Sequence, residues 1–236
     1  MSTIKEIADN YQDVEHHHKQ IHEYFCHETN KIPELKELRD WVESNIFGFG
    51  ERSFYYMWKL IVDEMPKEFS FLEIGVFRGQ TLALIQILAK LTEKKAHIYG
   101  VTPLDSTDGH WESNYAEDIL NIHYKFNLKQ PTIIKGLSTD ERVIVETIKV
   151  APFDLVYIDG GHTYDVVKSD LKNYCNLASK YLVVDDCANK FKLPSGMFAG
   201  IEPVSKAVDE YLPPYTSNEN FTYLCNIVHN RIWKRN

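Results

Sequence analysis

Long apolar runs are absent from this sequence. None of its apolar stretches approaches the roughly 20 residues that a helix needs to cross a bilayer. The segment Met1–Glu6 is polar and has no apolar core of the kind found in signal peptides. The sequence therefore predicts neither a membrane span nor secretion, and we expect a cytoplasmic protein.

Positive charge is in the minority. The chain has 26 Lys and Arg residues against 34 Asp and Glu residues, which gives a formal net charge of -8. An acidic surface repels phosphate backbones and anionic lipid headgroups. This balance disfavours nucleic acids and membranes as partners.

Cysteine is scarce and widely spaced. The four cysteines form neither a C-x-x-C pair nor a spacing typical of zinc sites. We expect reduced thiols that fill small apolar sites, with one disulfide pair as the alternative. They are Cys26, Cys175, Cys187 and Cys225.

What the sequence does contain is a regular alternation of elements from about Phe69 onward. Continuous apolar runs separated by helical patterns indicate parallel strands covered on both faces, in a doubly wound arrangement. Two further apolar runs near the end of the chain are joined by a short turn at His229–Asn230, so they must pair antiparallel. We therefore predict a Rossmann-like α/β fold with seven strands, five parallel and two in a C-terminal hairpin. The expected strands are 70–75, 96–101, 132–134, 153–158, 181–184, 221–227 and 231–234.

Residues 1–66 have a different pattern, with helical stretches at 31–38 and 55–62. The second stretch has an aromatic face. We expect a helical cap or a dimerisation surface, with a simple extension of the core as the alternative. His18 and His22 form an i,i+4 pair, for which we expect a solvated helix face rather than a metal site.

The first motif is Glu73–Thr81, EIGVFRGQT, which follows an apolar strand and opens a helix. Gly75 allows a tight turn, and Gly79 allows the chain to pass close to a ligand. The spacing is not G-x-G-x-x-G, and no lysine follows the glycine, so neither a dinucleotide fingerprint nor a P-loop is present. A glutamate at the end of the strand suits a ligand with positive charge, such as an amino group or a sulfonium.

This motif resembles the acidic-x-Gly-x-x-x-Gly motif of the class I S-adenosylmethionine-dependent methyltransferases. The resemblance implies S-adenosylmethionine as the cofactor and a methyltransferase domain over residues 67–236. A glycine turn without a ligand is the alternative. The implied cofactor contacts in this segment are Glu73, Gly75, Val76, Gly79 and Thr81.

Carboxylates follow two of the expected strands. Asp159 comes directly after 153–158, and the pair Asp185 and Asp186 follows 181–184. If these strands are neighbours, about 4.8 Å apart, three carboxylates converge at the ligand-binding edge of the sheet. Such crowding is unfavourable unless a cation or a proton is shared, and Mg²⁺ prefers oxygen ligands. The alternative is that one of the pair caps the next loop while Asp159 serves only the cofactor.

The run Asp159–Tyr164, DGGHTY, sharpens the resemblance. With Asp170 and the acidic pair downstream, it is similar to the small-molecule and sugar O-methyltransferases whose motif reads Asp-Gly-x-His-x-Tyr. Some relatives there act on sugars of antibiotics, glycolipids or glycans and use Mg²⁺. The resemblance implies metal ligands at Asp159, Asp185 and Asp186, and a sugar or glycan-type acceptor with a free hydroxyl.

The sequence departs from the family at the end of the second strand. Thr102 stands where most members have an acidic residue that binds the ribose, and Asp105 follows three residues later. Ser138 stands where relatives contact the adenosine, although capping of the helix before Asp140 explains it equally well. We expect Thr102, Asp105, Ser138 and Asp159 among the cofactor contacts. His110, Trp111 and Tyr115 belong to a loop that often shapes the acceptor pocket.

The implied mechanism is in-line displacement at the sulfonium methyl by an acceptor hydroxyl. His162 is the candidate general base, because its unperturbed pKa lies near neutrality. A hydrogen bond from His162 to a loop carbonyl is the alternative, and Asp159 takes the proton if no metal binds. Rival functions are a catechol-type O-methyltransferase, a nicotinamide-dependent enzyme and a non-catalytic binding protein on the same fold.

Overall fold

The computed structural model describes residues 3–105, 114–212 and 219–236. Within these residues, seven strands form one sheet in the order β3-β2-β1-β4-β5-β7-β6. The first five strands run parallel, and β7 is antiparallel to both β5 and β6. The prediction of a parallel sheet closed by a C-terminal hairpin is confirmed. The strands are β1 (Glu68–Ile74), β2 (Lys95–Thr102), β3 (Thr132–Lys135), β4 (Phe153–Ile158), β5 (Ala178–Val184), β6 (Phe221–Ile227) and β7 (Asn230–Arg235).

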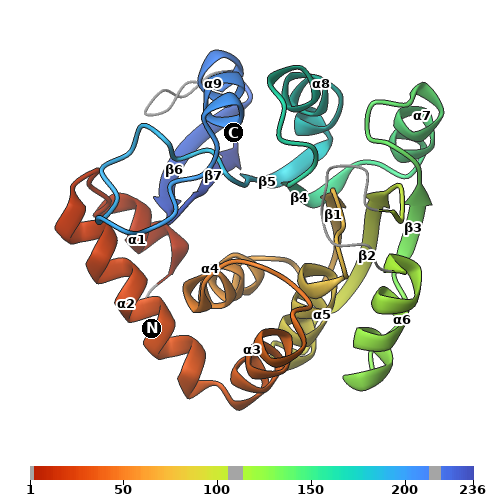
Figure 1. Ribbon diagram of the computed structural model, residues 1–236, viewed down its shortest axis with the longest axis horizontal. Helices are drawn as coiled ribbons and strands as arrows, with labels where there is room; N and C mark the ends of the chain where they lie inside the picture. The colour runs from red at the N-terminus through yellow and green to blue at the C-terminus, as the bar shows by residue number, and fades with distance from the viewer. Residues whose placement is uncertain (1–2, 106–113, 213–218) are drawn as a thin grey trace.

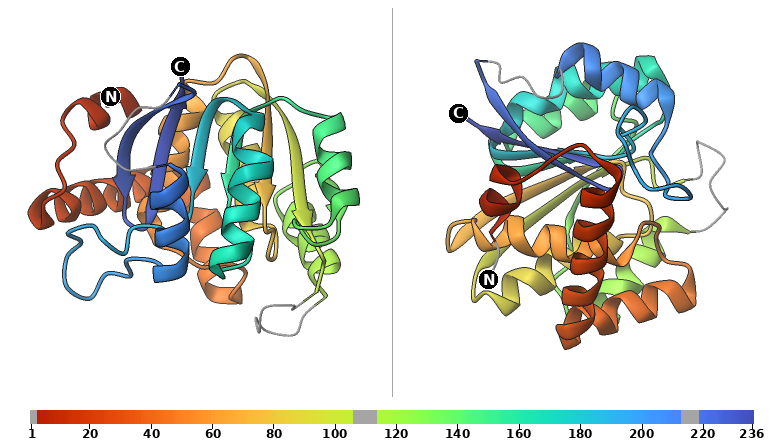
Figure 2. Two further views of the ribbon diagram at one scale, coloured as in Figure 1. Left: turned by 90° about the horizontal axis from the view of Figure 1, so that it is seen from above. Right: turned by 90° about the vertical axis from the view of Figure 1, so that its left-hand side faces the viewer.

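Helices cover both faces of the sheet, as Figures 1 and 2 show. Three helices pack on one face: α4 (Arg52–Asp63), α5 (Gln80–Leu91) and α6 (Tyr115–Lys125). Helices α1 (Ile4–Asp9), α2 (Glu15–Lys31) and α3 (Pro33–Asn45) lie outside them. On the part of the chain that the structure describes, no helix is both long and apolar enough to cross a membrane. The other face is covered by α7 (Glu141–Lys149), α8 (Tyr164–Tyr174), which continues into a short 3₁₀ helix (Cys175–Leu177), and α9 (Glu202–Tyr211).

The aromatic face of α4 packs directly on the sheet. Trp58 is fully buried, and its ring lies edge-on to Phe71 of β1 at 5.7 Å and to Tyr157 of β4 at 5.1 Å. Ile21 and Phe25 of α2 belong to the same apolar cluster. Residues of the predicted N-terminal region thus share one core with the sheet, which is the core-extension alternative.

The solvated helix face expected around His18 is wrong. His18 is 4% exposed, and its Nε2 lies 2.9 Å from Asp13 Oδ1. His22 contacts the hydroxyl of Ser53 on α4 at 3.0 Å. The physical reason is that α2 packs along α4, so the side of α2 that carries both histidines faces inward. The expectation of reduced thiols is confirmed, because all four cysteines are free.

A buried histidine on α6 makes the stability of this fold depend on pH. His123 is fully buried, and burial lowers its pKa from 6.5 to about 4 although its Nδ1 lies 2.7 Å from the carbonyl of Ile119. The unfolded chain takes up a proton below its pKa near 6.5, whereas the folded chain resists protonation until about pH 4. Falling pH in this window therefore favours the unfolded state.

We expect His123 to lower the free energy of unfolding by up to about 3 kcal/mol between about pH 7 and about pH 4. Urea denaturation of wild type and His123→Gln at several pH values measures this. The variant keeps a polar side chain that does not titrate, so its stability should fall less on acidification. Parallel pH profiles for the two proteins would contradict the prediction.

The register of the central strands places three chain segments at one edge. Ile74 at the end of β1 is paired with Ile158 of β4, and Ile158 is paired with Val184 of β5. The backbone continues this alignment one residue further, because the N–H of Asp159 donates to Ile74 at 2.8 Å and the N–H of Asp185 donates to Ile158 at 3.0 Å. The residues after β1, β4 and β5 therefore start side by side.

Candidate active site

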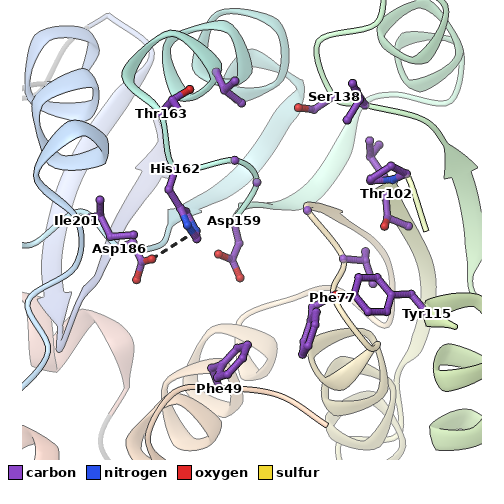
Figure 3. A pocket seen from close by; sticks show the side chains of 18 of the residues that line it. Phe49, Phe77, Thr102, Tyr115, Ser138, Asp159, His162, Thr163, Asp186 and Ile201 are labelled. Carbon is purple, nitrogen blue, oxygen red and sulfur yellow. Dashed lines mark ion pairs between the residues drawn. The ribbon is translucent and has the colours of Figure 1, made fainter. Parts of the chain in front are cut away.

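A cavity of about 960 Å³ opens at this carboxyl edge of the sheet. Ligand sites commonly measure about 300–1,000 Å³, so this cavity has room for a cofactor and an acceptor together. Its walls come from the loops after β1 to β5, from residues 49–51 before α4, and from Phe198, Ile201 and His229 near the hairpin. Figure 3 shows its side chains converging from both faces of the sheet.

Gly75 forms the floor where two loops cross. Its φ of +97° is a conformation that L side chains rarely adopt. A Cβ at this position would lie 2.0 Å from the carbonyl oxygen of Asp159 and 2.5 Å from the Cα of Gly160. The turn after β1 therefore touches the backbone of the turn after β4. Both Gly75 and Val76 line the cavity.

Three other residues of the first motif do not line the cavity. Glu73 is 4% exposed beneath the turn, and burial raises its pKa to about 8. Thr81 is buried in the first turn of α5. Gly79 also has a positive φ, but a Cβ there would meet Ile119 and Ile122 of α6 at 3.2–3.3 Å. The expected approach of a ligand at Gly79 is therefore wrong: this glycine allows two helices to pack closely.

The residues predicted after β2 and β3 do line the cavity. The Thr102 hydroxyl accepts a hydrogen bond from the N–H of Leu104 at 3.1 Å, which holds the turn that precedes Asp105. Ser138 lines the opposite wall, and its carbonyl accepts a hydrogen bond from Tyr174 at 2.6 Å. The N-cap of α7 is Asp140, so the capping alternative for Ser138 is wrong.

Carboxylates and histidines gather at the end of the cavity next to the hairpin. The potential ligand atoms of Asp185, Asp186 and His229 all lie within 4.8 Å of one another. His229 Nε2 lies 3.3 Å from Asp185 Oδ1, and its Nδ1 lies 3.8 Å from Glu51 Oε2. His162 Nε2 lies 3.5 Å from Asp186 Oδ2, as Figure 3 shows.

The closest group differs from the predicted trio of carboxylates. Asp159 points into the same space as Asp186 but is not a member of the group within 4.8 Å, and His229 takes its place. The cause is the antiparallel pairing of β7 with β5, which aligns Val184 with Arg231 and brings the hairpin turn over the acidic pair. In addition, Asp186 has a φ of +53°.

Burial and mutual repulsion disfavour the charged forms of these carboxylates. Burial raises the pKa of Asp159 well above its usual range, and the charges of Asp185 and Asp186 add to the shift. Burial and then Asp185 raise the pKa of Asp186 to about 7. Burial alone would lower the pKa of His229, but Asp185 and then Glu51 outweigh it and raise that pKa. Among the described residues, the buried Oδ1 of Asp185 has no hydrogen-bond partner. This arrangement is suited to share a cation.

Comparison with known proteins identifies the central segment. Residues 72–187 match a family model described as a methyltransferase domain. This segment is a methyltransferase domain. It holds β1 to β5 and the acidic pair, and it lies within the predicted limits of 67–236. The prediction of a methyltransferase is confirmed for this segment.

The methyltransferase domain has relatives of known structure. The chain is 13% identical to a putative caffeoyl-CoA O-methyltransferase from Staphylococcus aureus, with a TM-score of 0.60 over 88% of this chain and 94% of that one. It is 14% identical to a TDP-rhamnose 3'-O-methyltransferase of calicheamicin biosynthesis, with a TM-score of 0.53 over 97% and 98%. MycE methyltransferase of the mycinamycin pathway, in complex with Mg and SAH, is 17% identical, with a TM-score of 0.51 over 86% and 54%. These likenesses show the fold.

A relative in sequence comes from Acanthamoeba polyphaga mimivirus. It is an uncharacterized protein, 26% identical over 153 residues, which cover 62% of this chain and 64% of that protein. The chain therefore spans less than two thirds of the length of this relative.

Several residues around the methyltransferase domain were not predicted. Glu51 and Phe49 come from the segment before α4, and Phe49 stacks on Phe77 with 5.2 Å between ring centroids. Phe77 in turn meets Tyr115 edge-on at 5.0 Å, while Phe198 packs against His229 at 5.4 Å. Their positions in the sequence carry no strand or motif signal. The predicted pocket residues His110 and Trp111 lie outside the described residues.

Proposed function

We propose that this methyltransferase domain transfers the methyl group of S-adenosylmethionine to a hydroxyl of a sugar or glycan-type small molecule with the help of a divalent cation. One observation carries this proposal. The glycine turn after β1 and the group of carboxylates and histidines after β4 and β5 open into one cavity. A cofactor and an acceptor hydroxyl can therefore meet there.

The cofactor half of the cavity is bounded by the turns after β1, β2 and β3. The backbone at Gly75 leaves space that a side chain would fill. Asp105 lies on the wall next to Thr102 and can accept hydrogen bonds from ribose hydroxyls. The acidic lining suits a sulfonium, which carries a positive charge. Related structures contain SAH, namely MycE and an O-methyltransferase from Bacillus cereus.

A divalent cation fits the other half. Asp185, Asp186 and His229 would hold the ion, with Asp159 close by, because the group combines crowded carboxylates with a buried oxygen that has no hydrogen-bond partner. Mg²⁺ accepts oxygen ligands readily, and MycE was solved with Mg. When bound, such an ion lowers the pKa of an acceptor hydroxyl and orients it.

His162 is placed to take the hydroxyl proton. Its side chain is 33% exposed at the cavity wall, and Asp186 lies 3.5 Å from its Nε2. As the acceptor oxygen attacks the methyl carbon, a C–O bond forms, the C–S bond breaks and SAH leaves. The proton moves to the imidazole, and the neighbouring carboxylate stabilises the imidazolium. Asp159 is the second candidate base in this cavity.

A catechol-type acceptor is the second candidate function. The stacked pair Phe49 and Phe77, with Tyr115 beside it, offers flat apolar surface to an aromatic diol. The same surface also suits the apolar face of a sugar ring. Vicinal hydroxyls in either compound can bind one cation, so only the acceptor separates the two functions.

Isothermal titration of the protein with S-adenosylmethionine, with and without Mg²⁺, tests the proposal. We expect micromolar binding of the cofactor and a separate heat of Mg²⁺ binding that is lost in Asp185→Ala. Asp159→Ala should weaken cofactor binding, because Asp159 lies between the two halves of the cavity. Absence of cofactor binding under all these conditions would remove the proposed function.

A further inference from the structure

We propose that the acceptor carries no phosphate, so that it is a neutral or cationic hydroxyl compound rather than a nucleotide-linked sugar or an acyl-CoA. This inference rests on the proposed function and narrows its substrate class. It matters because both kinds of acceptor occur among the related structures, whose titles name TDP-rhamnose, caffeoyl-CoA and mycinamycin VI.

The charged side chains that line the cavity are carboxylates and histidines. Among the described residues, the lining contains no Lys and no Arg. Residues 106–113, STDGHWES, lie outside the described residues, but their sequence also contains neither basic residue. Each lining histidine lies beside a carboxylate, His162 beside Asp186 and His229 beside Glu51. The lining carboxylates are Glu51, Asp105, Asp159 and Asp186.

Two guanidinium groups near the lining are already engaged. Arg78 follows Phe77, and its Nε lies 2.7 Å from Asp118 Oδ2. Arg142 lies next to Gly136, where it donates to the Lys135 carbonyl at 2.6 Å and forms an ion pair with Glu146 at 3.0 Å. Phosphate recognition normally uses such guanidinium forks or lysines. Neither arginine is available to an acceptor without breaking an existing pair.

Helix N-termini, the other common phosphate sites, are also countered here. Thr163 and Ile201, the N-caps of α8 and α9, line the cavity. The first turn of α8 contains Asp165, and the first turn of α9 contains Glu202 and a proline without an N–H. An acidic side chain in the first turn already balances the positive end of the helix dipole.

Bound cofactor and metal do not reverse this charge. A sulfonium and a divalent ion bring three positive charges, against Asp185 and the four lining carboxylates. Protonation of a buried carboxyl removes a negative charge but adds no donor cation for a phosphate. A diphosphate brought into this cavity therefore meets like charge, which opposes binding.

Calorimetry with two phosphate probes tests the inference. Protein saturated with SAH and Mg²⁺ is titrated with thymidine diphosphate and with coenzyme A, the anionic parts of the two phosphate-bearing acceptors. We expect no dissociation constant tighter than about 1 mM for either probe. Micromolar binding of either one would overturn the inference. In parallel, methyl transfer to TDP-rhamnose should not exceed transfer to methyl rhamnoside, and a faster reaction with TDP-rhamnose would also overturn it.

Two variants of Phe198 supply the matched control. This side chain is 49% exposed at the cavity and contacts His229. Phe198→Arg adds one cation, so it should bind thymidine diphosphate at least about tenfold more tightly than Phe198→Gln. Wild type that binds this probe as tightly as Phe198→Arg would count against the inference. Titration with S-adenosylmethionine in the same experiment separates the two proposals, since protein that binds the cofactor and also binds thymidine diphosphate refutes only the acceptor class.

Discussion

Gly75→Ala is expected to unfold at a markedly lower urea concentration than wild type and to lose its affinity for S-adenosylmethionine. The added Cβ would lie 2.0 Å from the carbonyl oxygen of Asp159, and the φ of +97° is itself unfavourable for alanine. The contact is with backbone, so no side-chain rotation relieves it. Either the turn after β1 or the turn after β4 must move, and both turns line the cavity.

Gly196→Ala is the matched control for this prediction. Gly196 has a φ of +86°, but a Cβ there meets no atom within 4 Å. It therefore measures the backbone term alone, about 1–2 kcal/mol. We expect Gly75→Ala to cost at least about 3 kcal/mol, because steric displacement is added to strain. Equal losses of stability in the two variants, with cofactor affinity retained in Gly75→Ala, would show that the two loops do not touch as described.

The fold was predictable because the strands are apolar throughout. The predicted limits 153–158 and 221–227 coincide with β4 and β6, since both faces of each strand are covered and polar residues mark both ends. The N-terminal helices were harder to place. The aromatic stretch that contains Trp58 indicates a helix, but helical periodicity alone does not say whether its apolar face meets the sheet or a second protein. Only the contacts with Phe71 and Tyr157 decide this.

The site was predictable where it depends on strand ends and not where it depends on long-range pairing. Asp159, Asp185 and Asp186 follow apolar strands, so their common edge can be inferred from the sequence. His229 lies in a hairpin turn, and it reaches Asp185 only because β7 inserts between β5 and β6. Glu51 precedes α4, and no local pattern connects it with the hairpin. Tertiary packing brings these two residues to the site.

Asp185→Asn and Asp186→Asn are expected to abolish stabilisation of the protein by divalent cations. An ion that binds only the folded state raises the midpoint of thermal unfolding of wild type in proportion to its occupancy. Loss of supporting groups around a metal typically lowers affinity by about 10–100-fold, so loss of a direct ligand should lower it by more than about 100-fold. His229→Gln should weaken binding as well, because its Nε2 faces the same group.

The metal-free proteins should respond in the opposite direction, and this separates a metal site from ordinary surface charge. Replacing Asp185 by Asn removes repulsion from Asp186 and Asp159, so metal-free Asp185→Asn should be at least as stable as metal-free wild type. Asp165→Asn makes the same change in net charge on the exposed side of α8, so its response to Mg²⁺ or Mn²⁺ should match that of wild type. Thermal unfolding of all four proteins with and without each ion gives the comparison. If wild type and Asp185→Asn gain equally from the ion, the cation binds elsewhere. If neither gains, proton uptake by the buried carboxyls or by His229 must relieve the repulsion instead, and the hydroxyl must be activated by His162 and Asp159 alone.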